Sequence, residues 1–345
     1  MQKNTSYKTK IEHPFLLIPV KIKENAERLS FYIEEQKVLE YRVFPLEEGE
    51  TVDYYAPLPV TPWIGKTIRL EGNYPEAFYT QIKQADDPTE SDQVHPLMHF
   101  TPVNGWMNDP NGLVFEDGIY HLFYQHNAFG TKWDNMSWGH AVSKDLLHWE
   151  HRPMAILPDK DGTIFSGSGI CNEKGLLGLP KDALVFFYTS AGGSSDSPWS
   201  EGGQFTQRIA YSTDHGATLH KKGDVIVPNL TEGNRDPKVY WHEESKGYIM
   251  SLYLKNMTIG GMTAQDNVSL ELDKNSLVII PKDADFSDTE ASLYYSQRMS
   301  GSAPGSYRRG RGKVDPVYGI GRIFHRRFRW LSFHESFGRT HGLSE

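Results

Sequence analysis

Three short segments of the chain gather residue types that can do nucleophilic or acid–base chemistry. They are HFTPVNGWMNDPNGLVF (99–115), FSGSG (165–169) and NRDPK (234–238). Carboxyl groups on separate segments suit glycoside cleavage. One attacks the anomeric carbon, one protonates the leaving oxygen, and a third stabilises the charge of the transition state. Asp109 and Asp236 are candidates for two of these roles, and no downstream residue clearly supplies the remaining one.

Each segment also has an ordinary structural interpretation. Asn, Asp, Pro and Gly are turn residues in their own right, so the run around Asp109 is consistent with a tight turn before an apolar strand. The small residues of FSGSG either let a ligand approach the backbone or form a bend. Arg235 beside Asp236 is typical of a solvated ion pair or of a turn. Four aromatic residues could stack on sugar rings or fill a core, namely Trp106, Trp133, Trp138 and Phe165.

The surrounding pattern predicts the β-structure that must position these residues. Residues 12–90 contain alternating or apolar runs between polar turns, such as VLEYRVF and TIRLEG, and predict a small antiparallel β domain. The polar, Pro-containing stretch 84–93 predicts a linker. Short strands then recur every ten to fifteen residues up to about residue 254, without an intervening amphipathic helix. This repetition predicts a propeller, a barrel or a sandwich.

Composition restricts the class of protein. The 345 residues include 36 basic and 44 acidic ones, for a net charge of −8. That length suggests about two domains, and 38% hydrophobic residues can bury a real core. The single cysteine, Cys171, excludes an intrachain disulfide and a cysteine-built zinc site. Without a long apolar run or a secretory-type N-terminal segment, we expect a cytoplasmic location and no membrane partner.

Taken together and in this order, the motifs resemble those of glycoside hydrolase family 32, which contains invertases, levanases, inulinases and sucrose-6-phosphate hydrolases. The resemblance covers about residues 95–254. It rests on WMNDPNG (106–112), FYQ (123–125), Trp133, WGHAVSKDLLHW (138–149), FSGS (165–168) and RDPKV (235–239). It implies an all-β fold, a five-bladed β-propeller with the active site in its central funnel, followed by a C-terminal β-sandwich.

The same resemblance implies hydrolysis of β-fructofuranosidic bonds in sucrose, sucrose 6-phosphate or a fructan by a retaining mechanism. Asp109 is then the nucleophile and Asp236 the transition-state stabiliser, and retaining enzymes hold their two catalytic carboxyl groups about 5 Å apart. The residues implied to contact the fructosyl unit are Asn108, Gln125, Trp133, Phe165, Ser166 and Arg235. This chemistry needs no metal ion and no organic cofactor. We therefore expect a fructose-containing carbohydrate as the partner, and no nucleic acid.

The sequence departs from the family pattern after residue 254. The family's acid/base is a glutamate in a Glu-Cys-Pro-Asp-like motif, which this chain lacks in frame. Glu271 and Glu290 lie in the right region without the right context. Synonymous codons for residues 298–304, read one nucleotide later, permit the string ECPDLL. We therefore interpret residues 298–345 as a poorly ordered tail translated out of frame. This interpretation implies that the acid/base, the end of the propeller and the sandwich are missing.

These observations divide the chain into an N-terminal β domain (1–90), an incomplete propeller (91–297) and the tail (298–345). Two other functions stay open. One is a remnant that binds fructosides without cleaving them. The other is RNA binding by the tail, which holds ten basic against three acidic residues and the run RRGRGK. A related propeller family acts on arabinosides or xylosides, but WMNDPNG together with RDPKV favours fructosides.

Overall fold

The N-terminal part of the chain folds into two antiparallel sheets that share one core. The larger sheet has the strand order β1-β6-β3-β4 and the smaller one the order β5-β2-β7. The elements are β1 (Thr5–Lys10), β2 (Phe15–Val20), β3 (Glu27–Ile33), β4 (Gln36–Val43), β5 (Tyr54–Pro59), β6 (Thr67–Gly72), α1 (Glu76–Thr80) and β7 (Lys83–Ala85). Alternate residues of β6, such as Ile68 and Leu70, enter the core, whereas every residue of β2 is buried. The alternating run of β6 and the apolar run of β2 therefore correspond to burial of one face and of two faces.

The computed structural model describes residues 5–87, 96, 98–175, 178–230, 232–242, 247–253, 269–272 and 275–281. All of these belong to one compact unit. The predicted linker, 84–93, begins too early: Gln84 and Ala85 lie in β7 and pair with Leu16 and Phe15 of β2. The rest of that linker lies outside the described residues except for residues 86 and 87, and so does the tail, 298–345. The predicted domain boundary at residue 90 stays a prediction.

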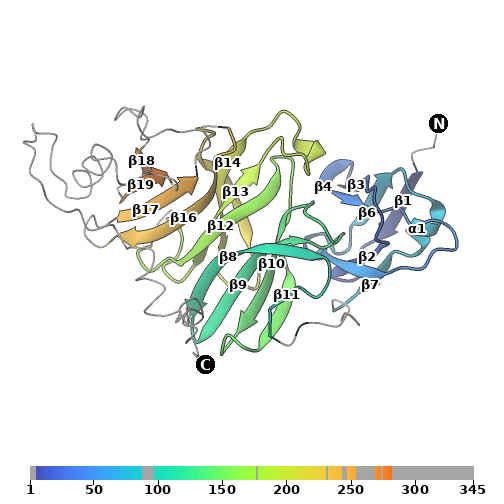
Figure 1. Cartoon of the computed structure of the whole chain (residues 1–345), viewed down its shortest axis with the longest axis horizontal. Helices are drawn as coiled ribbons and strands as arrows, with labels where there is room; N and C mark the ends of the chain where they lie inside the picture. The colour runs from blue at the N-terminus through green and yellow to red at the C-terminus, as the bar shows by residue number, and fades with distance from the viewer. Residues whose placement is uncertain are drawn as a thin grey trace, which may run out of the picture. The chain divides into compact units, whose positions relative to one another are not determined.

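Three more four-stranded sheets follow in chain order (Figure 1). Their orders are β11-β10-β9-β8, β12-β13-β14-β15 and β16-β17-β19-β18. The strands are β8 (Trp106–Glu116), β9 (Ile119–Asn127), β10 (Ser137–Ser143), β11 (Trp149–Ile156), β12 (Thr163–Cys171), β13 (Leu184–Ala191), β14 (Phe205–Ser212), β15 (His220–Val227), β16 (Arg235–His242), β17 (Gly247–Tyr253), β18 (Ser269–Leu272) and β19 (Asn275–Pro281). The first two sheets are antiparallel throughout, whereas β17 pairs with β19 in parallel. The all-β class and a propeller arrangement are therefore confirmed. Five blades and a C-terminal sandwich stay predictions.

Strand β13 shows how these sheets are held together. Its residues are buried on both faces. Phe186 and Tyr188 join the core against the β8–β11 sheet, while Val185 and Phe187 join the core against β16 and β17. A strand buried on both faces reads as a continuous apolar run rather than an alternating one, which is why the sequence here is LVFFYTSA.

The structure corrects the expectation of a tight turn around Asp109. The run around Asp109 is not a turn before a strand, because residues 106–116 all belong to β8. The pairing of β8 with β9 instead shifts register between Met107 and Pro110, and again between Asn111 and Val114. Proline and glycine therefore mark irregularities inside a strand, where extra residues redirect side chains. Within the part of the chain that the structure describes, no helix is long and apolar enough to cross a membrane.

Candidate functional site

Asp109 lies on β8, inside the first of the two register shifts, with an exposed side chain. Pro110 has no N–H group to donate to the neighbouring strand, which favours a bulge at this point. The hydroxyl group of Ser166, on β12, donates a 2.7 Å hydrogen bond to Oδ2 of Asp109. The first and second motifs of the sequence thus meet at the carboxylate proposed to attack. Asn108, the preceding residue, is also exposed.

The FSGSG motif connects β8 to β16 across β12. Ser166 bonds to Asp109 on β8, and Ser168 bonds to Pro237 on β16. The Ser168 hydroxyl donates to the Pro237 carbonyl at 2.8 Å and accepts the Val239 N–H at 2.9 Å. The motif therefore holds Asp109 and the Arg-Asp-Pro segment in one hydrogen-bonded array.

The glycines of this motif serve packing within the protein. A Cβ atom at Gly167 would overlap the carbonyl oxygen of Phe187 on β13. A Cβ atom at Gly169 would lie 2.9 Å from the rings of Phe186 and from Val114. The register of β12 and β13 also shifts between Phe165 and Gly167. The FSGSG segment is therefore not a bend but part of β12, with glycines that allow close packing at this irregularity, and approach of a ligand to its backbone stays a prediction.

Asp236 lies at the start of β16 in a left-handed backbone conformation, with φ of 59°. Its N–H donates to the Thr189 hydroxyl at 3.1 Å, and that hydroxyl donates to Gln207 at 2.7 Å. Left-handed non-glycine residues are costly and cluster at functional sites. The buried Thr189 and Gln207 thus fix the backbone of Asp236, a role that no pattern in the sequence indicates.

Arg235 is held rather than freely solvated. Its guanidinium group lies 4.0 Å from the centre of the Tyr253 ring, and its Nε lies 3.8 Å from Oδ2 of Asp236. Nη1 also donates to the Gly233 carbonyl at 3.0 Å. Burial lowers the pKa of nearby Lys238 to about 8, so this side chain is still largely protonated at pH 7. The expected ion pair is present but only partly solvated, because the Arg235 side chain is packed against Tyr253.

The aromatic candidates divide into exposed and buried ones. Trp133 is 43% exposed and meets the ring of Phe165 edge-on, with 5.9 Å between centroids. Trp138 is fully buried, and its indole N–H donates to the Phe165 carbonyl at 3.0 Å. Gln125 is buried as well, and its amide donates to the Ile164 carbonyl at 2.9 Å. Trp138 is therefore a core residue, whereas Trp133 and Phe165 form one aromatic pair.

The two glutamates considered from the sequence for the acid/base position stay untested by the described residues. Glu271 lies in β18, whose side chains the structure does not describe, and Glu290 lies outside the described residues.

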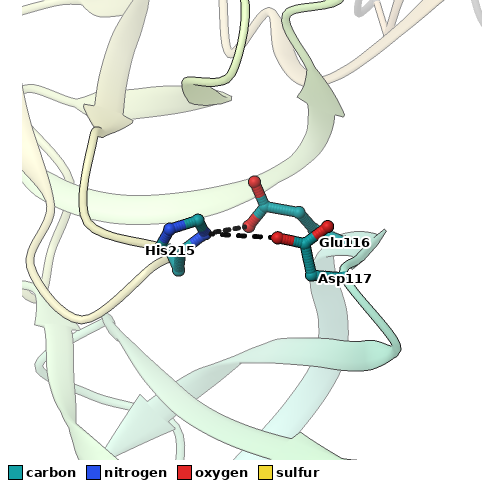
Figure 2. Close-up of side chains that lie close together, drawn as sticks. All are labelled: Glu116, Asp117 and His215. Atoms are coloured by element: carbon teal, nitrogen blue, oxygen red, sulfur yellow. Dashed lines mark hydrogen bonds and ion pairs between the residues drawn. The ribbon is translucent and has the colours of Figure 1, made fainter.

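A second group of titratable side chains lies at the other end of β8. Glu116 is seven residues beyond Asp109 on this strand, about 20 Å away at the usual rise per residue. His215, in the turn between β14 and β15, approaches Glu116 and Asp117 with Nδ1 at 3.1 and 4.0 Å from their oxygens (Figure 2). These residues border a cavity of about 890 Å³ whose lining includes the stacked pair His121 and His140. The group therefore ties a turn of one sheet to a turn of the next, away from Asp109.

The Glu116–His215 pair predicts a pH-dependent contribution to stability. The hydrogen bond and charge of Glu116 raise the pKa of His215 above its ordinary value of 6.5. A raised pKa in the folded state means that the pair stabilises fully below about pH 6.5 and is lost as the pH rises through the folded-state pKa. We expect His215→Gln to lower the unfolding temperature at pH 6 and to match the unmodified protein at pH 8.5, as measured by calorimetry. An unfolding difference of equal size at both pH values would contradict this.

The His215→Gln variant must be compared with the unmodified protein at each pH. This is because His121 and His140 make the stability depend on pH in the opposite direction. Burial lowers the pKa of His121 to about 4 and that of His140 well below 6.5. Their neutral forms therefore favour the folded state, and stability falls as the pH drops below about 6.5. Burial, the largest cause, is common to both proteins and cancels in the difference, whereas the smaller effect of the His215 charge on His121 does not.

Residues 99–264 match the model of the glycosyl hydrolases family 32 N-terminal domain. The levanase of Bacillus subtilis is 44% identical over 49% of this chain and 24% of its own length. The extracellular exo-inulinase of Aspergillus awamori is 37% identical over 49% of this chain and 36% of its own length. An invertase of Schizosaccharomyces pombe is 36% identical over 56% of this chain and 33% of its own length. The chain thus spans only about a quarter to a third of these relatives.

Solved structures with detectable likeness include the crystal structure of the exo-inulinase from Aspergillus awamori. It has a TM-score of 0.42 and 38% identity, over 46% of this chain and 34% of the other. Another is a fructofuranosidase from Schwanniomyces occidentalis complexed with fructose. It has a TM-score of 0.41 and 37% identity, over 46% of this chain and 31% of the other.

Proposed function

Because residues 99–264 match the model of the glycosyl hydrolases family 32 N-terminal domain, we propose that this chain carries a fructoside-cleaving site with Asp109 as its nucleophile. The observation that carries the proposal is the 2.7 Å hydrogen bond from Ser166 to Asp109. This bond brings the motifs WMNDPNG and FSGSG together at the carboxylate of Asp109. The names of the relatives, levanase, exo-inulinase and invertase, support a fructose-containing substrate.

In the proposed reaction, one carboxylate oxygen of Asp109 attacks the anomeric carbon of a fructosyl unit. The bond to the leaving oxygen breaks as the new bond forms, and water later hydrolyses the fructosyl-enzyme with overall retention. Ser166 orients the carboxylate by donating to Oδ2. This leaves Oδ1 available for attack. An oriented nucleophile lowers the entropy cost of reaching the transition state.

Asp236 takes the role of stabilising the oxocarbenium-like charge and of holding sugar hydroxyl groups. Two features support this. The backbone of Asp236 is fixed by Thr189, and its side chain is only a quarter exposed. A carboxylate held in place before the reaction stabilises developing positive charge without reorganising. Arg235, packed on Tyr253, completes this side of the site as a donor to the sugar.

The chain in its present frame contains no residue with the family context of the general acid. Loss of a general acid costs about 10²–10⁴ in rate when the leaving group is a poor one. A sugar alkoxide is a poor leaving group, whereas a nitrophenolate leaves without a proton. The proposal therefore has a distinctive consequence. The chain forms the covalent intermediate with activated fructosides and cleaves sucrose poorly.

The test is a parallel assay of a nitrophenyl β-fructofuranoside and of sucrose with the full chain. We expect release of nitrophenolate, with a burst equal to the enzyme concentration if hydrolysis of the intermediate is slow, and a sucrose rate lower by about 10²–10⁴. Calorimetric titration with fructose runs alongside. Fructose binding without nitrophenolate release would instead favour a remnant that only binds fructosides. Absence of both would refute the proposal.

A further inference from the structure

The segment that carries Trp133 is supported from both ends by the N-terminal sheets. This loop, residues 128–136, connects β9 to β10. Within it residues 131–133 are exposed, while residues 128–130, 135 and 136 are buried. Trp133 meets Phe165, and the residue after Phe165 bonds to Asp109. Whatever fixes the loop therefore fixes one wall of the candidate site.

The first support is a shared apolar core. Ala128 and Phe129 are buried among the core residues of the N-terminal sheets. The ring centroids of Phe129 and Tyr41 are 4.4 Å apart, and the hydroxyl group of Tyr54 donates to the Ala128 carbonyl at 3.1 Å. The start of the loop is thus packed as an element of the N-terminal core rather than of the propeller sheet.

The second support is a polar clamp at the other end of the loop. Asn135 is 2% exposed, and its side-chain amide pairs with both backbone groups of Arg42 on β4. Oδ1 accepts the Arg42 N–H at 2.7 Å, and Nδ2 donates to the Arg42 carbonyl at 2.8 Å. Nδ2 also donates to Asn127 at 3.1 Å, and Asp134 forms a 3.1 Å ion pair with the Arg42 side chain. The amide therefore pairs with β4 in the way that an adjoining strand would.

We propose that the N-terminal β-sheets are a positioning element of the fructoside site, acting through Asn135 to hold Trp133 against bound sugar. Two anchors bracket a short exposed stretch, so its conformation is set by the N-terminal sheets and not by its own sequence. The proposal rests on the proposed function because Trp133 contacts sugar only if fructosides bind here. It assigns Asn135 as a positioning residue for substrate binding and leaves the attack by Asp109 unaffected.

The experiment compares Asn135→Ala with Asn172→Ala in the full chain. Asn172 is an equally buried amide that donates to the carbonyls of Leu179 and Pro180 in a loop of the second sheet. Both substitutions remove a buried amide and its donated hydrogen bonds, so both report the general cost of that loss. Arg42→Gln is a milder third variant. It removes the ion pair to Asp134 and retains the backbone groups that Asn135 binds, so it is expected to fold even if Asn135→Ala does not.

With the nitrophenyl fructoside, we expect Asn135→Ala to raise KM about tenfold with kcat nearly unchanged. Arg42→Gln should shift KM in the same direction by about twofold, and Asn172→Ala should leave it unchanged. Amide hydrogen exchange should accelerate in residues 128–136 for Asn135→Ala and not for Asn172→Ala. An unchanged KM, or a KM shift shared by Asn172→Ala, would overturn the proposal. If Asn135→Ala does not fold, an unchanged KM in Arg42→Gln would overturn the proposal.

Failure of this inference is distinguishable from failure of the proposed function. If the unmodified chain releases nitrophenolate and Asn135→Ala has an unchanged KM, only the positioning role is refuted, even when exchange in the loop accelerates. If the unmodified chain neither binds fructose nor releases nitrophenolate, the fructoside site itself is refuted, and the positioning role is refuted with it.

Discussion

Asp109→Asn is expected to abolish the release of nitrophenolate from an activated β-fructofuranoside, with a fall of about 10⁴-fold or more. The amide group of asparagine is a far weaker nucleophile than a carboxylate and cannot form the fructosyl ester. Because the carboxamide oxygen can still accept the hydrogen bond from Ser166, the change removes the chemistry and keeps the local contact. The measurement is the burst and steady-state rate by absorbance, with mass spectrometry of the trapped fructosyl-enzyme.

Two control measurements test whether Asp109→Asn still folds and whether its effect is specific to this carboxylate. The Asp109 side chain is exposed, so the unfolding temperature of Asp109→Asn should match that of the unmodified chain. Asp117→Asn changes an exposed carboxylate in the turn at the other end of the same strand, and it should keep full activity. Substantial turnover by Asp109→Asn, or a fructosyl adduct on another residue, would contradict the assignment of Asp109 as the nucleophile.

The parts of the fold that could be predicted are those whose signal is local. Alternation in TIRLEG and the continuous run LVFFYTSA both identify strands because burial of one face or of two faces determines the sequence pattern directly. Strands β11, β12 and β15 show no such local signal. They carry the mixed sequences WEHRPMAI, TIFSGSGIC and HKKGDVIV, in which exposed or small residues hide the pattern. Such strands are held mainly by pairing with neighbours, which a local pattern does not record.

The candidate site divides in a similar way. Asp109, Ser166 and Asp236 could be proposed because their motifs are compact. The contacts that hold the site could not be proposed from the sequence. Thr189 bonds to Asp236, 47 positions away in the chain, and Asn135 bonds to Arg42, 93 positions away. The left-handed conformation of Asp236 is likewise imposed by packing and hydrogen bonds. The contacts that support Asp109 and Asp236 were therefore not predictable from the sequence, because their partners lie far away in the chain.

The second large effect concerns the general acid, and it depends on the reading frame. If residues 298–345 arise from a frame slip between codons 255 and 297, correcting the slip is expected to raise the rate of sucrose hydrolysis by about 10²–10⁴. The rate on the nitrophenyl fructoside should change little, because its leaving group needs no proton. The measurement begins with resequencing of the gene from codon 250 onward. It then compares both substrates for the present chain and for a chain read one nucleotide later from codon 298.

The two-substrate design separates a restored acid from a general improvement in folding. A chain that merely folds better should gain equally on both substrates, whereas a general acid acts only on the poorer leaving group. Gln in place of the glutamate of the restored ECPD string should remove the gain on sucrose and spare the activated substrate. Equal gains on both substrates, or sucrose hydrolysis by the present chain at the rate of the corrected one, would show that the acid does not come from this segment. In that case the acid must be sought among the carboxyl groups of the present frame.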